Sequence, residues 1–379
     1  MSNINNNLEY IVEKAKKPAL FVEQCEERYN RIIENIAKKV ESDSKIEIIM
    51  LAGPSSAGKT TTAKKISEAL KKNGINSYAI SLDDFYLDNC DAPRFPDGTP
   101  DFETVHALDI PFFYEVMKRI LETGEADIPE FDFLTGKRKE EFNHIKIQNR
   151  EVIIVEGLHA LNPIITKELP SDRLYKIYIN VSSRIYDNGK EIVLNKRNMR
   201  FVRRLVRDYN FRGNSVDKTL EMWVTVRYGE DTYLFPYRHN ADIKINTVHL
   251  YETCVLKGTA IKLLSEVEKE AIGLICQREG LTPDDLKKAL SEVRPNTEHV
   301  FPSDDETKVR YLMDMVALMM IDGDINTNEF VLCKVAARAM GYRDEVIDAM
   351  SDVGKMMSYR LKETALGGLA TTETAKGFT

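Results

Sequence analysis

The chain has 379 residues, of which 43% are hydrophobic and 30% are charged, and its net charge is −7. This length predicts two domains, or one large domain with an appendage. No apolar run approaches the roughly 18 residues of a membrane span, and an acidic protein has little general affinity for nucleic-acid backbone. We therefore expect neither a membrane nor a nucleic acid as a partner.

The amino-terminal segment has neither the basic nor the apolar stretch of a secretion signal, and the five cysteines stand singly, without the spacing of a zinc site or a disulfide framework. We expect a cytoplasmic protein with reduced thiols.

Apolar residues recur at helical spacing over residues 7–42, which predicts one or two amphipathic helices that lead into the core rather than form it. Beyond them, short apolar runs alternate with helical patterns. The predicted strands cover residues 46–51, 77–82, 152–155, 174–179 and 241–245, and the predicted helices cover 60–72, 109–123 and 199–230. This alternation predicts the α/β class, with a doubly wound parallel sheet and helices on both faces.

The pattern becomes helical only from about residue 262, and residues 294–307 combine two prolines with mixed charge, as a linker does. Two apolar helices are predicted beyond it, at 309–321 and 329–340, which indicates a small all-α C-terminal domain. The predicted organisation is a helical lead-in at 1–44, an α/β domain at 45–262, a helical connector and linker at 263–304, a helical domain at 305–365 and a flexible tail at 366–379.

Residues 53–60, GPSSAGKT, match the pattern GxxxxGK[ST] between a predicted strand and a predicted helix. In this motif backbone N–H groups point at phosphate oxygens, the lysine reaches the terminal phosphates and the hydroxyl binds Mg²⁺. The alternative is a chance match in a glycine-containing turn, which the strand-to-helix context disfavours. The motif predicts a P-loop NTPase-type sheet and an ATP site made by Gly53, Ser55, Ser56, Ala57, Gly58, Lys59, Thr60 and Thr61.

Acidic residues follow two of the predicted strands directly, Asp83 and Asp84 after one and Glu156 after the other. Ligands of doubly wound sheets bind outside the carboxyl ends of the strands, so we expect these carboxylates beside the phosphate-binding loop. There, one carboxylate can accept the proton of an attacking hydroxyl and another can hold Mg²⁺. Solvated acids in turns are the alternative.

Arginines recur at spacings of three and four along the predicted helix at 199–230, at positions 200, 203, 204 and 207, and Arg212 follows. This spacing places the first four along one helix face. Such a face is either solvated surface or a lid whose arginines neutralise the transferring phosphoryl group and exclude water.

Six segments in order resemble the uridine kinase and phosphoribulokinase family, most closely the bacterial uridine kinase-like nucleoside kinases. They are GPSSAGKTTTA, SLDDFY, PDFETVHALD, FDFLTGKR, VIIVEGLHALNP and RRLVRDYNFRGNS, and the resemblance covers about residues 45–260. It implies a kinase domain that transfers a phosphoryl group from ATP, with Mg²⁺, to a hydroxyl of a small molecule, most simply a nucleoside.

The resemblance also implies roles for single residues. Asp83 matches the catalytic base, Glu156 matches the acidic partner of Mg²⁺, and Arg212 matches a lid arginine at the ATP. The implied catalytic residues are Lys59, Asp83, Arg204 and Arg207, and the implied metal contacts are Thr60, Asp83 and Glu156. Glu103 falls where uridine kinases hold the ribose with an Asp. The implied substrate contacts are Asp84, Tyr86, Glu103, Phe131, Arg138 and Arg207.

Two departures from the family pattern concern the base. Uridine kinases read the pyrimidine with a Tyr and a His in the segment that matches FDFLTGKR, where this chain has Phe131 and Gly136. Loss of a hydrogen-bonding pair changes discrimination strongly, so uridine and cytidine are not secure substrates, and a sugar phosphate is an alternative acceptor. Arg138 is retained. His159 lies near the predicted site, but a structural histidine is the simpler interpretation, and it stays outside the catalytic set.

Residues 311–350 resemble the TerB-like helical domain. An EF-hand reading of Asp322, Asp324 and Asn326 fails, because Thr327 and Cys333 stand where that loop needs Gly and Glu; a helix end and a capping box explain the segment better. A protein partner for this domain and a homo-oligomer are hypotheses. A nucleotide-hydrolysing regulator and a nucleotide-binding scaffold are the other function classes, and the chain lacks the NKxD guanine signature.

Overall fold

The computed structural model describes residues 6–95, 98–133, 135–148, 151–187, 191–264, 303–320 and 327–343. The chain forms two compact units, Met1–Arg207 with Thr225–Lys257 and Asp208–Val224 with Gly258–Thr379. Most of the predicted linker, the tail and the acidic residues at 322–326 lie outside the described residues. The predicted domain boundaries stay predictions.

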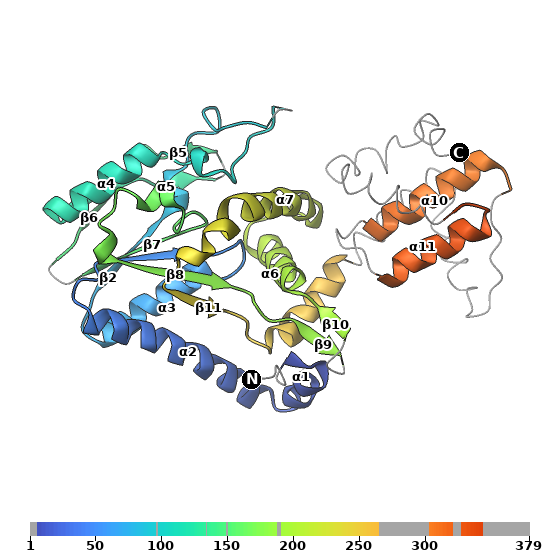
Figure 1. Ribbon diagram of the computed structural model, residues 1–379, viewed down its shortest axis with the longest axis horizontal. Coiled ribbons are helices and arrows are strands. Elements are labelled where there is room, and N and C mark those ends of the chain that lie inside the picture. The colour runs from blue at the N-terminus through green and yellow to red at the C-terminus, as the bar shows by residue number, and fades with distance from the viewer. Residues whose placement is uncertain are drawn as a thin grey trace. The chain divides into compact units, whose positions relative to one another are not determined.

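A five-stranded parallel sheet forms the centre of the first unit, in the strand order β11-β8-β1-β7-β2 (Figure 1). Its strands are β1 (Ile48–Ala52), β2 (Ser77–Ser81), β7 (Val152–Gly157), β8 (Leu174–Asn180) and β11 (Ile243–Asn246). All four pairings are parallel. The predicted parallel α/β sheet is confirmed, and β1, the strand that precedes the phosphate-binding loop, lies in its middle.

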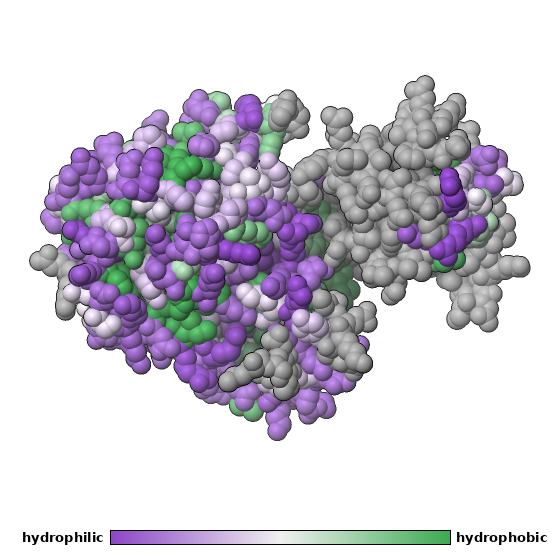
Figure 2. Space-filling model, viewed as in Figure 1, coloured by the Kyte–Doolittle hydropathy of each residue, from purple (hydrophilic) through white to green (hydrophobic). Residues whose placement is uncertain are grey.

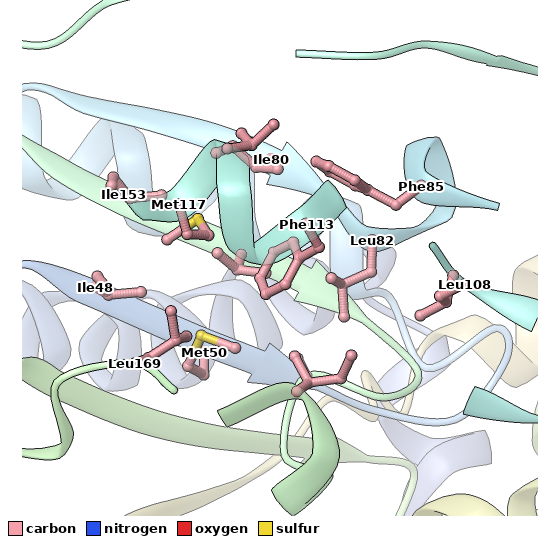
Figure 3. Close-up of a cluster of buried hydrophobic side chains, with 14 of the residues drawn as sticks. Ile48, Met50, Ile80, Leu82, Phe85, Leu108, Phe113, Met117, Ile153 and Leu169 are labelled. Carbon is pink, nitrogen blue, oxygen red and sulfur yellow. The ribbon is translucent and has the colours of Figure 1, made fainter. Parts of the chain in front are cut away.

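Helices cover both faces of this sheet, and the alternation of side chains along β1 shows how. Ile48 and Met50 point into a cluster with α4 (Ile110–Thr123) and α5 (Pro163–Thr166), which Figure 3 shows in part. Ile49 and Leu51 point to the other face, against α2 (Pro18–Ser42) and α3 (Lys59–Lys72). Successive strand residues face opposite sides, so a strand buried on both faces has to be apolar throughout, and β1 is completely buried.

The second helix of the chain belongs to the core. The buried residues of α2 in the cluster with the sheet are Tyr29, Ile33, Ile36, Ala37 and Val40. The prediction that residues 7–42 lead into the core without forming it is wrong, because the apolar face of α2 closes one side of the sheet. α1 (Leu8–Ala15) packs elsewhere, with Phe21, Ile185 and Met199 around its Ile11.

Short antiparallel pairs extend from the loops, and the sequence patterns did not predict them. They are β3 (Glu125–Ile128) with β6 (Asn143–Lys146), β4 (Phe131–Asp132) with β5 (Lys137–Arg138), and β9 (Ile185–Asp187) with β10 (Glu191–Leu194). The predicted helical stretch at 199–230 is two helices, α6 (Lys196–Phe211) and α7 (Val216–Gly229), followed by one π-helical turn at Glu230–Leu234.

Two described helices of the second unit pack on each other: α10 (Asp305–Met320) and α11 (Thr327–Ala339), through Leu312, Val316 and Ala337 among others. The helical character predicted for this region is confirmed there, and the resemblance to a TerB-like domain stays a prediction. Within the described part of the chain no helix is long and apolar enough to cross a bilayer. The face seen in Figure 2 is mainly hydrophilic where it is coloured.

Candidate active site

The phosphate-binding loop runs from the end of β1 to the start of α3 and depends on two glycines. A Cβ at Gly53 would lie 2.5 Å from Cγ1 and 2.8 Å from the backbone oxygen of Ile179 on β8, so only glycine lets the loop leave the sheet this close to its neighbour. Gly58 has a φ of +91°, and Ser56 is also left-handed, at +59°. Left-handed backbone is costly for residues other than glycine and clusters at functional sites.

The carboxylates predicted at the strand ends do converge on this loop. The Thr60 hydroxyl donates to Oε1 of Glu156 at 2.9 Å. Glu156 pairs in register with Ser81 of β2, and a short 3₁₀ turn, Leu82–Phe85, follows directly and carries Asp83. A Cβ at Gly157 would lie 2.6 Å from Cβ of Leu82, so this glycine lets the turn pack against the end of β7.

The charges around Glu156 show the same convergence. Its side chain is buried, and burial raises its pKa above the ordinary value. The nearby Lys59 ammonium opposes this shift, whereas the negative charges of Asp83 and Asp84 add to it. The lysine and threonine of the loop and the strand-end acids therefore share one electrostatic environment.

These residues fit a magnesium ion. Oε2 of Glu156 is buried and accepts no hydrogen bond from the described residues, which leaves a hard oxygen available beside the Thr60 hydroxyl. Mg²⁺ in phosphoryl-transfer sites is held by one or two protein oxygens together with substrate phosphates, and no larger cluster of His, Cys, Asp and Glu gathers among the described residues. The donor set matches that chemistry.

Three arginines of α6 donate hydrogen bonds to the phosphate-binding loop itself. Nε of Arg200 donates to the backbone oxygen of Ser55 at 3.0 Å, and a terminal nitrogen of Arg204 donates to Oγ of Ser55 at 2.7 Å. One terminal nitrogen of Arg203 donates to the backbone oxygen of Ser56 at 3.4 Å, and its Nε and other terminal nitrogen donate to the carboxylate of Glu252. The alternative of a purely solvated arginine face is wrong for these residues, since Arg200 and Arg204 are buried.

Ser55 also departs from the expected geometry. Its backbone N–H, which the motif predicts to face phosphate, donates to Oε1 of Glu230 at 2.8 Å. Further along α6, Arg207 is partly buried. Arg212 belongs to the second unit, where its guanidinium lies 3.7 Å from Oδ1 of Asp208. The phosphate-contacting roles of Arg207 and Arg212 stay predictions.

Glu103, the residue expected to hold a substrate hydroxyl, shares this environment. Burial first, and then the charge of Glu230, raise the pKa of Glu103 to about 7, against the opposing charges of Arg204 and Lys59. The side chain of Glu103 packs directly on the backbone of Gly229, where an added Cβ would overlap with Cβ of Glu103.

Aromatic rings surround Tyr86 on the expected substrate side. Phe102, Phe131 and Phe133 lie within 5.7 to 6.5 Å of it, centroid to centroid. Phe133 is 66% exposed, so part of this apolar surface faces solvent. The hydroxyl of Tyr86 donates to the backbone oxygen of Phe102.

Two of the expected substrate contacts have partners within the protein. Asp84 accepts a hydrogen bond from the backbone N–H of Phe131 at 3.4 Å, and burial raises its pKa. Arg138 pairs with Asp109 at 2.9 Å and lies over the ring of Phe112. Both contacts hold the β4–β5 hairpin in place, so in this structure the two residues shape the substrate side.

Asn89 fills the space beside Gly136. The backbone at Gly136 has a φ of +66°, and a Cβ there would overlap with the amide group of Asn89. The backbone N–H of Asn89 donates to the backbone oxygen of Gly136 at 2.9 Å. A larger side chain at position 136 would therefore need left-handed backbone and a shift of the exposed Asn89 side chain.

His159 is 2% exposed, and burial lowers its pKa to about 4. Its ring packs edge to face with Tyr233 at 6.3 Å. The structural interpretation of His159 stays a prediction.

The sequence reasoning missed Glu230 and Gly229. Glu230 lies 175 residues beyond Ser55, from whose N–H it accepts a hydrogen bond. A single glutamate at the end of a helical stretch belongs to no recognisable motif. The available signal was a glycine next to an acid inside a predicted helix, a position where glycine usually has a packing reason.

A phosphate-binding loop whose threonine donates a hydrogen bond to a strand-end carboxylate, on a parallel sheet with β1 in the middle, is the nucleotide-binding site of a P-loop protein. The chain belongs to the phosphoribulokinase / uridine kinase family, whose model matches residues 48–253. It is a kinase, and its family phosphorylates hydroxyl groups of small molecules.

Among curated proteins, the uridine kinase of Borrelia duttonii is 30% identical over 201 residues, which are 53% of this chain and 86% of that protein. A uridine kinase of Clostridium botulinum is 29% identical over 199 residues, 52% of this chain and 86% of its own. Among solved structures, the phosphoribulokinase of Rhodobacter spheroides has a TM-score of 0.36 and 16% identity, covering 55% of this chain and 75% of that one. The D-glycerate 3-kinase of Cryptococcus neoformans has a TM-score of 0.37 and 14% identity, covering 57% of this chain and 89% of that one.

Proposed function

We propose that this protein is an ATP- and Mg²⁺-dependent kinase that phosphorylates a hydroxyl of a nucleoside. The observation that carries the proposal is the hydrogen bond between Thr60 and the buried Glu156, with Lys59 and Asp83 in the same electrostatic environment. The curated relatives named uridine kinase support a nucleoside as the acceptor.

In this proposal each residue has one task. Lys59 and the backbone N–H groups of the loop bind the donor's phosphates, and Thr60 and Glu156 would hold the magnesium ion, which supplies charge neutralisation at those phosphates when bound. Asp83 takes the proton of the acceptor hydroxyl while the oxygen of that hydroxyl forms a bond to the terminal phosphorus. The bond between that phosphorus and the bridging oxygen breaks, and ADP leaves. Arg204 and Arg207 neutralise the transferring group.

One observation favours a second acceptor class. The position of the family's base-reading His is Gly136, which has left-handed backbone beside the amide of Asn89, and the Tyr position is Phe131, which is 7% exposed. A site built without these hydrogen-bonding groups loses the means to select uracil or cytosine. A nucleoside with another base, a sugar phosphate or another small alcohol is the alternative acceptor.

A phosphate-transfer screen tests both. Nucleosides, sugar phosphates and small polyols are offered with Mg-ATP, and transfer is measured by ADP release together with mass spectrometry of the product. We expect one acceptor class to be phosphorylated. ADP release that no acceptor stimulates would contradict the proposal and favour a nucleotide-hydrolysing regulator.

The Asp83→Asn variant is the control for mechanism. It removes the base but keeps the loop, so nucleotide affinity should stay within about twofold while transfer falls by about 10²- to 10⁴-fold. Equal transfer by this variant would mean that another group accepts the proton.

Cytoplasmic location, homo-oligomerisation and a partner for the C-terminal helices remain predictions from the sequence.

A further inference from the structure

Gly229 and Glu230 touch three separate parts of the site. Gly229 packs its backbone on Glu103, Glu230 accepts from the loop N–H of Ser55, and Glu230 also pairs with Arg200 of α6. The dipeptide stands at the junction of α7 and the single π-helical turn, an irregularity that is frequent at functional sites.

The polar groups of Ser55 are all engaged by this arrangement. Its N–H donates to Glu230, its carbonyl accepts from Arg200, and its hydroxyl accepts from Arg204. Arg200 and Glu230 are 2% and 1% exposed. Hydrogen bonds between charged groups are strong and directional when water is excluded, so this pair fixes the start of the loop with respect to α6.

The other contact acts on the acceptor side. No side chain larger than that of glycine fits at position 229, because Glu103 occupies the space. Moving Gly229 therefore moves Glu103, whereas moving Glu230 moves Ser55. Gly229 and Glu230 are joined by one peptide bond, and together they connect the phosphate-binding loop to the carboxylate of Glu103.

We propose that Gly229 and Glu230 are positioning residues of the kinase reaction, which set the phosphate-binding loop and the acceptor-binding Glu103 in register with each other. The acceptor half of this inference rests on the proposed function; the loop half rests on the contacts of Ser55 and Glu230 alone.

Two variants separate these halves in the full-length protein. Gly229→Ala pushes on Glu103, and we expect the KM for the acceptor to rise about tenfold or more while nucleotide Kd changes less than about twofold. Glu230→Gln removes the charge opposite Arg200, and we expect nucleotide Kd to rise about tenfold, with a fall in kcat. Gly258→Ala is the matched control, because a Cβ there meets nothing within 4 Å. Thermal unfolding of each variant reports folding.

Nucleotide Kd is measured with a fluorescent ATP analogue and Mg²⁺, without any acceptor. The test of the loop half is therefore independent of the result of the phosphate-transfer screen. An unchanged Kd in folded Glu230→Gln would overturn the loop half. Equal changes of Kd and KM in Gly229→Ala, or values like those of Gly258→Ala, would overturn the acceptor half. If Glu230→Gln does not fold, Arg200→Lys, which keeps the charge opposite Glu230 but loses the Nε–H donor to the carbonyl of Ser55, replaces it, with the same expected rise in Kd.

Discussion

Glu103 holds its proton to a higher pH than an ordinary glutamate, since burial and the charge of Glu230 raise its pKa from 4.5 to about 7. The folded protein therefore binds more protons at this site than the unfolded chain between these two pH values. Stability from this group is full below pH 4.5 and is lost as the pH rises toward 7. The charges that face Glu103 are those of Glu230, Arg204, Asp83 and Lys59.

Glu103→Gln, which imitates the protonated form, should remove this pH dependence. Relative to the wild type, we expect the variant's melting temperature to gain about 2–4 °C between pH 5 and pH 8. Thermal unfolding without nucleotide and Mg²⁺ measures the difference, and Glu34→Gln, at an exposed position of α2, is the control. A difference in melting temperature between the variant and the wild type that stays constant with pH would show that the pKa of Glu103 is not raised by folding.

At the scale of elements, α2 is part of the structural core of the kinase unit. Ile36 is 1% exposed in the cluster that covers one face of the sheet, whereas Leu20 of the same helix is 46% exposed. Ile36→Ala should lower the free energy of unfolding by about 2–5 kcal/mol, through lost burial and the cavity left behind. Leu20→Ala should change it by less than about 0.5 kcal/mol. Chemical denaturation compares the two, and equal losses would contradict the assignment of α2 to the core.

Much of the element order followed from the sequence because buried parallel strands are short apolar runs, as IEIIML before the phosphate-binding loop shows. The loop and the three acids at the ends of two strands were predicted together for a related reason, since parallel strands end on one edge of the sheet. Pairs as short as β4 with β5, two residues each, are below the length at which periodicity is visible.

The contacts of Ser55 could not be predicted either. Its fit to the motif suggested a phosphate contact, but the partner of its N–H comes from a residue 175 positions away in the chain. Local patterns define which residue types stand in a loop. Tertiary packing decides which of their polar groups are already bound to the protein.

At the scale of the whole molecule, α6 begins in one compact unit and ends in the other. Its Arg200, Arg203 and Arg204 belong to the unit of the phosphate-binding loop, and its last residues group with the chain beyond Gly258. The arginines that bind the phosphate-binding loop therefore stand on the helix along which the chain passes from one compact unit to the other.

Removal of residues 295–379 tests the regulatory role hypothesised for the C-terminal helices. If these helices regulate the kinase, nucleotide affinity and the rate of phosphate transfer should each change several-fold in the truncated chain. Nucleotide titration and the transfer assay measure the effects, and unchanged values for both would remove the support for a regulatory role of the C-terminal helices.

The packing of Asn89 on Gly136 also constrains how the specificity of this chain can evolve. A histidine at position 136 would overlap with the amide of Asn89 and would have to adopt left-handed backbone. The exposed side chain of Asn89 can turn aside, but the cost of left-handed backbone for a residue with a Cβ remains, so a histidine at 136 should lower stability while the backbone keeps this conformation. A change of base specificity at this position therefore needs a new backbone conformation in the turn between β4 and β5 as well as a new side chain.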